Sequence, residues 1–173
     1  MAIWTLIPLV TCFAYIILFV FSLPSIKGQI NRVFTFYLAI SAVWSFCAFM
    51  LHLNAIPEQA LFWNEALTIV LIWTLITYYH FIRAFANKPA GTGILLGYVF
   101  LVILAVLSFT GYIVQYAYVT DGVLYHSLGI SIYFLGAASL TFIGSGLYIL
   151  VKKYRSSIDP ADRNRTMYLI IGW

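Results

Sequence analysis

The longest charged stretch of this chain is KKYRSSIDPADRNR, residues Lys152–Arg165. It follows an apolar run that ends at Val151, and a new apolar run begins directly after it at Thr166. The stretch holds five of the nine lysine and arginine residues of the chain, which are Lys152, Lys153, Arg155, Arg163 and Arg165. Because basic residues between apolar runs set the orientation of a chain in a bilayer, these five are the predicted topology-setting residues.

The composition points to a membrane protein. The 173 residues are 64% hydrophobic and 8% charged, whereas soluble domains carry about 25% charged residues. Runs of about twenty apolar residues recur, and each can cross the ~30 Å hydrocarbon core of a bilayer as a helix. The composition therefore excludes a soluble globular domain and predicts an all-α, polytopic transmembrane helical bundle.

The apolar runs predict five complete spans and the start of a sixth. The complete spans cover residues 3–23, 33–53, 58–85, 94–114 and 128–151, and the sixth begins at 166–173. This last segment reaches only ~10–12 Å as a helix. We therefore expect residues 1–173 to form one transmembrane domain at the front of a longer protein. Between the fourth and fifth spans we expect a tyrosine-rich outer loop with Asp121-Gly122 at its tip.

The distribution of charge predicts the orientation. With these spans, all nine lysine and arginine residues fall on one side, and the positive-inside rule makes that side cytoplasmic. The amino terminus is then outside. Because the cations sit in short loops, the net charge of +4 does not indicate nucleic-acid binding. Cys12 and Cys47 each lie inside an apolar run, so we interpret them as packing residues rather than a disulfide or metal pair.

The predicted outer side carries the first group of candidate site residues. Ionisable groups in membrane spans are costly and are therefore candidates for function. Glu65 lies about two turns into the third span, ~10 Å along the axis from Glu58 and on the same face. His52, Asp121 and His126 lie at similar depth, so the five residues could form a pocket for a cation, a metal or a proton. Alternatively, each side chain simply sits at the wet interface and caps a helix end. No two of them have a ligand spacing such as HxxxH, and the sequence leaves both the ligand and any metal open.

The second group of candidate residues lies near the inner end of the third span. Tyr79, His80 and Arg83 are the predicted relay residues there. Arg83 can extend to lipid phosphates while its stem stays in hydrocarbon, and His80 also fits a hydrogen-bonded interface residue. Glu65 and Arg83 share one stripe of the helix, ~27 Å apart along its axis. If that stripe faces the bundle interior, a sliding third helix would move both ends at once.

The fifth span is rich in small residues. Ala137, Thr141 and Ser145 fall on one face at i, i+4 and i+8, and we expect this ladder to let a neighbouring helix approach closely. The chain has no HExxH motif, no glycine-rich phosphate loop and no plausible Ser/His/Asp arrangement. We therefore expect no catalytic residue and no cofactor in this stretch.

Several short motifs lie in places consistent with a known family. They are Asn31-Arg32, Phe36 and Trp44 in the second span, Phe62-Trp63 and Tyr79-His80-Phe81 at the two ends of the third, and Tyr154-Arg155, Asp159-Pro160, Arg163-Asn164-Arg165 and Gly172 around the start of the sixth. In these motifs and in its layout, almost the whole chain resembles the amino-terminal seven-transmembrane sensor region of bacterial sensor histidine kinases.

The resemblance implies an architecture and a function. Two further helices would deliver the carboxyl terminus to the cytoplasm, where a dimerising linker and a kinase, or a cyclic-dinucleotide synthase, would follow. The full-length protein would then be a homodimeric enzyme in a bacterial inner membrane. Residues 1–173 hold none of those parts, and His80 is not a phosphoacceptor because it lies at the membrane. The expected function is a sensory input module that relays an outer-face or intramembrane signal to a cytoplasmic output domain.

Two other classes of membrane protein have features that can be compared with this sequence. A transporter or channel subunit, the alternative, would favour an internal repeat and discontinuous helices with paired Gly/Pro breaks, but the five complete runs are uninterrupted. A membrane-embedded enzyme would need clustered histidines or carboxylates on the inner side, and the sequence has none. The expected partners are the lipid bilayer and an unidentified small molecule or ion, with no nucleic acid.

Overall fold

A computed structural model describes residues 3–120, 123–127, 129 and 131–172 of the chain. Within these residues the chain forms α-helices, two short 3₁₀ turns and one β-hairpin. In chain order the elements are α1 (Ile3–Ser22), η1 (Leu23–Ser25), α2 (Gln29–Leu53), η2 (Pro57–Gln59), α3 (Ala60–Phe85), α4 (Thr92–Phe109), β1 (Tyr116–Thr120), β2 (Val123–Ser127), α5 (Ser131–Ser156) and α6 (Pro160–Ile171).

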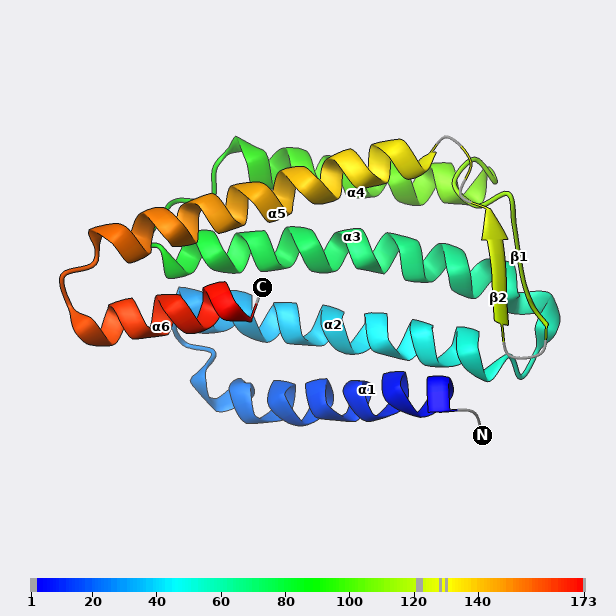
Figure 1. The fold of residues 1–173 in the computed structure, drawn as a ribbon, viewed down its shortest axis with the longest axis horizontal. Helices are drawn as coiled ribbons and strands as arrows, with labels where there is room; N and C mark the ends of the chain where they lie inside the picture. Colours follow the sequence, from blue (N-terminus) through cyan, green and yellow to red (C-terminus); the bar gives the residue numbers. More distant parts are fainter. Residues whose placement is uncertain (1–2, 121–122, 128, 130, 173) are drawn as a thin grey trace.

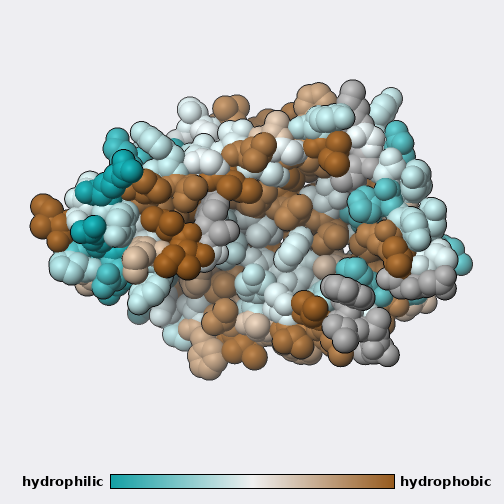
Figure 2. All heavy atoms as spheres, viewed as in Figure 1, coloured by the Kyte–Doolittle hydropathy of each residue, from teal (hydrophilic) through white to brown (hydrophobic). Residues whose placement is uncertain are grey.

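The helices lie side by side in alternating directions (Figure 1). Helix α3 occupies the middle and packs against α2, α4 and α5, while α1 packs on α2 and α6 folds back along α5. Figure 2 shows hydrophobic side chains along the length of one face and hydrophilic side chains gathered at both ends. The predicted all-α class is confirmed.

The two ends of the bundle differ in composition. We call one the hairpin end, because it holds the α2–α3 link and the β-hairpin (Figure 1). The other, the basic end, holds the α1–α2, α3–α4 and α5–α6 links. The basic side chains of these links and of the adjoining helix ends are Lys27, Arg32, Arg83, Lys88, Lys152, Lys153, Arg155, Arg163 and Arg165.

Four helices of the described chain are long and apolar enough to cross a membrane. They cover Thr5–Ser25, Gln29–Leu53, Pro57–Phe85 and Ile132–Ser156. The predicted fourth span, residues 94–114, is shorter than expected because α4 ends at Phe109. Gly111 follows with a φ of +73°, a left-handed conformation that glycine adopts without steric cost. Ile113 and Val114 therefore leave the helix and turn into the core, where each is 1% exposed.

A β-hairpin replaces the expected outer loop. Strands β1 and β2 pair antiparallel, with Tyr118 opposite Tyr125. The rings of Tyr116, Tyr118 and Tyr125 stack in a row, with centroids 6.0 and 5.3 Å apart. The expected tip, Asp121-Gly122, lies outside the described residues. Strand β1 packs against α3 and η2, so the hairpin lies across that end of the bundle.

The charged stretch 152–165 is mostly helical, which corrects the expected loop. Helix α5 continues to Ser156, and α6 begins at Pro160 rather than at Thr166. The side chain of Asp159 caps α6 by accepting hydrogen bonds from the backbone N–H groups of Ala161 (3.1 Å) and Asp162 (3.3 Å). Proline suits the first helical position because its missing N–H would be unpaired there anyway.

The small-residue ladder of α5 is not covered by a helix in the described chain. Ala137 and Thr141 are exposed and Ser145 is half-buried, so the expected close approach of a neighbouring backbone is not observed. A phenyl ring bridges α5 and α4 instead. A Cβ added at Gly97 of α4 would lie 2.9 Å from Cζ of Phe142, so this glycine makes room for the ring. Cys12 and Cys47 are free and buried, as expected of packing residues.

Candidate functional site

The candidate residues of the hairpin end occupy separate elements. His52 lies in the last turn of α2, Glu58 in η2, Glu65 in α3 and His126 in β2. Asp121 lies outside the described residues. Glu58 and His126 are exposed, while His52 and Glu65 are half-buried. Among the described residues, no three histidine, cysteine or acidic side chains are grouped so that they could hold a metal ion.

Glu65 is the member of this group with a specific buried neighbour. The Ser108 hydroxyl, in the last turn of α4, lies beside the Glu65 carboxyl. Ser108 is 3% exposed, and within the described chain its hydroxyl has no hydrogen-bond partner. The adjacent Asn64 is 4% exposed and its Nδ2 is likewise unpartnered there. Helix α3 therefore carries a polar patch toward the hairpin end, where a change of charge on Glu65 would act on α4.

Arg83, at the basic end of α3, binds protein rather than extending outward to lipid. Its Nε and Nη2 donate to the backbone carbonyl of Pro89 at 3.0 and 2.8 Å, and its Nη1 donates to the Tyr79 hydroxyl at 3.2 Å. These bonds fix the α3–α4 link to α3. Tyr79 is buried, and its ring contacts the ring of Phe142 in α5 at a centroid distance of 5.6 Å. The half-buried His80 meets the ring of Tyr98 in α4 edge-on.

The α5–α6 corner contains a contact that joins three helices. The Lys153 ammonium of α5 donates to Oδ2 of Asp162 in α6 at 2.8 Å and lies 4.9 Å from the ring centroid of Phe85, the last residue of α3. The Ser157 hydroxyl donates to the same Asp162 oxygen at 2.9 Å. A cation between a carboxylate and an aromatic face is attracted to both. The corner therefore links the end of α3 to the start of α6.

Two further contacts stabilise this corner. The guanidinium of Arg163 lies over the ring of Tyr154, 4.6 Å from its centroid. The Thr166 hydroxyl donates to the backbone carbonyl of Asp162 at 2.8 Å, and Thr166 is fully buried. The other predicted topology-setting residues, Lys152, Arg155 and Arg165, are exposed. Of the five, Lys153 and Arg163 thus also have specific aromatic contacts.

The corner is predicted to loosen in acid. The hydrogen bond from Lys153, followed by that from Ser157, lowers the pKa of Asp162 below its ordinary value. A folded-state pKa below the unfolded one adds stability that is complete above the unfolded pKa, about 3.9, and is lost as the pH falls through the folded value. Hydrogen exchange of amides 157–166, referenced to unfolded peptide at each pH, should show lower protection below about pH 4. In Asp162→Asn this part of the pH dependence should be absent; its persistence would contradict the assignment.

Sequence reasoning missed three residues of this region. Phe85, Asp162 and Pro89 supply the ring, the carboxylate and the carbonyl that hold Lys153 and Arg83. Asp162 stands nine positions after Lys153, and Pro89 six after Arg83, so each pair meets only because the intervening link turns back. The Asp159-Pro160 pair was a readable signal, because it is typical of a helix start and brings Asp162 into the first turn.

In comparisons with known proteins, no family model, no curated protein and no solved structure matches this chain.

Proposed function

We propose that this chain is a sensory input module of a bacterial inner membrane, which relays a signal to a cytoplasmic output domain such as a histidine kinase. In the proposed arrangement the hairpin end faces outward and the basic end faces the cytoplasm. The amino terminus is outside, five helices cross the bilayer, and α6 begins a sixth crossing. The gathering of the nine lysine and arginine residues at one end of the bundle supports this orientation.

The observation that carries the relay is the position of α3. This helix packs against α2, α4 and α5. It has Glu65 beside Ser108 toward one end and Phe85 against Lys153 at the other. Lys153 in turn binds Asp162 of α6. A signal that alters the charge or contacts of Glu65 would shift α3, and α6 would follow because the corner connects the two helices.

The mechanism needs only a small displacement. Packed helices in switching proteins move against each other by about 1–2 Å. A stimulus biases such a movement only by the difference in its affinity for the two arrangements. Glu65 suits this role because it is half-buried and has no ion-pair partner among the described residues. Its local packing is therefore sensitive to a proton, a cation or a polar ligand.

A matched pair of substitutions tests the relay. With nitroxide labels at the exposed positions Ala90 and Asn164, Glu65→Gln should shift the mean label distance in lipid nanodiscs by about 1–2 Å, the size of a helix displacement. Glu58→Gln removes the same charge from an exposed site of the hairpin end and should leave the distance unchanged. Pulsed electron–electron double resonance measures the label distance in the two variants and in the wild type. Equal distances in the two variants would contradict a relay through α3.

A further inference from the structure

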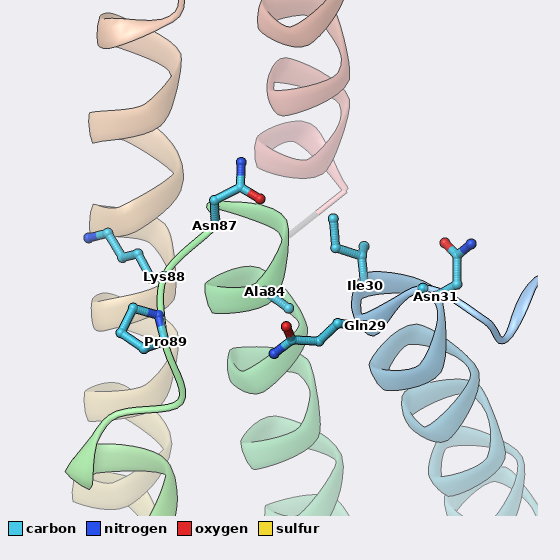
Figure 3. A pocket seen from close by; sticks show the side chains of 8 residues that line it. Gln29, Ile30, Asn31, Ala84, Asn87, Lys88 and Pro89 are labelled. Carbon is cyan, nitrogen blue, oxygen red and sulfur yellow. The ribbon is translucent and has the colours of Figure 1, made fainter.

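A cavity of about 460 Å³ lies at the basic end, between the start of α2 and the link from α3 to α4 (Figure 3). Residues 28–31 line one side, and Ala84 with residues 87–89 line the other. Its volume falls within the range of ligand sites, about 300–1,000 Å³. Its lining does not include Glu65, Phe85, Lys153 or Asp162.

The polar side chains that line this cavity are carboxamides and one ammonium group. They belong to Gln29, Asn31, Asn87 and Lys88, and no carboxylate is among the described residues around the cavity. In Figure 3, Gln29 extends from α2 toward α3, Asn87 stands at the end of α3, and the Lys88 side chain extends from the link on the side away from α2. The Asn31 Nδ2 donates to the backbone carbonyl of Ser25 at 2.8 Å. The carboxamide N–H groups that remain and the ammonium are hydrogen-bond donors that can bind an anion.

The surroundings of the cavity are positively charged. Lys27 and Arg32 flank residues 28–31 in the chain, and both are exposed. Of the acidic residues at this end, Asp162 is bound to Lys153, and Asp159 caps α6. Neither lining segment contains a carboxylate that would neutralise Lys27, Arg32 or Lys88, or Arg83, which donates to the Pro89 carbonyl.

The cavity also offers apolar contacts. Ile30, Ala84 and Pro89 line it together with the carboxamides. The cavity lies where two membrane-length helices end, at the expected level of lipid headgroups. A soluble anion would use only the donors and the charge, whereas a phospholipid would place its phosphate among them and its glycerol and first methylenes against the apolar side chains.

We infer that this cavity binds the phosphate headgroup of an anionic phospholipid from the adjacent leaflet. Basic pockets between helix ends at a membrane surface bind such headgroups. The inference rests on the placement of the bundle in a membrane and is independent of the relay through α3. A negative result in the relay test would not contradict lipid binding in the cavity. Failure of lipid binding would likewise not contradict the relay.

Native mass spectrometry of the purified protein in neutral detergent tests the site, with dioleoyl phosphatidylglycerol and dioleoyl phosphatidylcholine as probes. We expect preferential retention of one phosphatidylglycerol and a reduction of about fivefold or more in Lys88→Glu. Lys152→Glu makes the same charge change at an exposed position of α5 and should retain the lipid as the wild type does.

A second variant and a competitor complete the experiment. Asn87 has a φ of +53°, so Asn87→Gly removes the carboxamide without backbone strain and should also reduce retention of phosphatidylglycerol. Inorganic phosphate in large excess should not displace the lipid. Equal retention of both lipids, equal retention in Lys88→Glu and Lys152→Glu, unchanged retention in Asn87→Gly, or displacement by inorganic phosphate would each overturn the inference.

Discussion

A cysteine at Gln59 is expected to react with a membrane-impermeant maleimide added to intact cells, whereas cysteines at Ala90 and Ala161 should react only after the membrane is opened. Gln59 lies in the α2–α3 link, and the other two positions lie in the α3–α4 link and the first turn of α6, at the opposite end of the bundle (Figure 1). All three residues are exposed. The expected effect is all-or-none, because an impermeant reagent reaches one face of the bilayer.

The labelling experiment needs a background without the two natural thiols. Cys12 and Cys47 are free and buried, so Cys12→Ala and Cys47→Ala remove unwanted reaction with little change at the surface. If Gln59 and Ala161 are labelled from the same face, the proposed orientation is wrong and the cytoplasmic relay fails with it. If Ala90 and Ala161 are labelled from different faces, the antiparallel arrangement of α3 to α6 in the membrane is wrong.

The second large effect is expected from Ile76→Ala in the middle of α3. Ile76 is fully buried among side chains of α3, α4 and the segment after α4, and Ile72, Leu101 and Leu104 belong to the same cluster. Truncation leaves a cavity that close-packed helices cannot fill, and it should lower the free energy of unfolding by about 2–5 kcal/mol. Unfolding in mixed detergent micelles, followed by tryptophan fluorescence, gives this value.

Leu140→Ala is the matched control for the core substitution. Leu140 lies in α5 and is 73% exposed. In the proposed arrangement its side chain contacts lipid, which solvates it about as well in the unfolded chain as in the folded one. Its truncation should therefore change the free energy of unfolding by no more than about 0.5 kcal/mol. Equal losses in the two variants would contradict the packing of α3 at the centre of the bundle.

The sequence predicts which segments form membrane-length helices, because the length and hydropathy of each apolar run are sufficient to identify them. The runs that predict α1, α2, α3 and α5 are each long and apolar enough to span a bilayer. The residue at which α4 ends could not be predicted from hydropathy. Ile113 and Val114 extend the apolar run past Phe109, and the left-handed turn at Gly111 separates them from the helix.

Two short residue pairs indicate a turn and a helix start that the hydropathy pattern does not predict. Asp121-Gly122 between alternating tyrosines is typical of a β-hairpin, and Asp159-Pro160 is typical of a helix start. Hydropathy alone predicts loops at both places, because the surrounding residues are polar or aromatic. The contacts at the basic end were beyond sequence reasoning altogether, since the bonds from Arg83 to Pro89 and from Lys153 to Asp162 depend on how each link turns back.

The one-sided packing of α1 bears on how the chain enters the bilayer during synthesis. Helix α1 packs on α2 and η1, and few residues of its span are buried. Both partners leave the ribosome immediately after it. The first two helices can therefore move from the translocon into lipid as an antiparallel pair, and the other face of α2 is covered only when α3 follows.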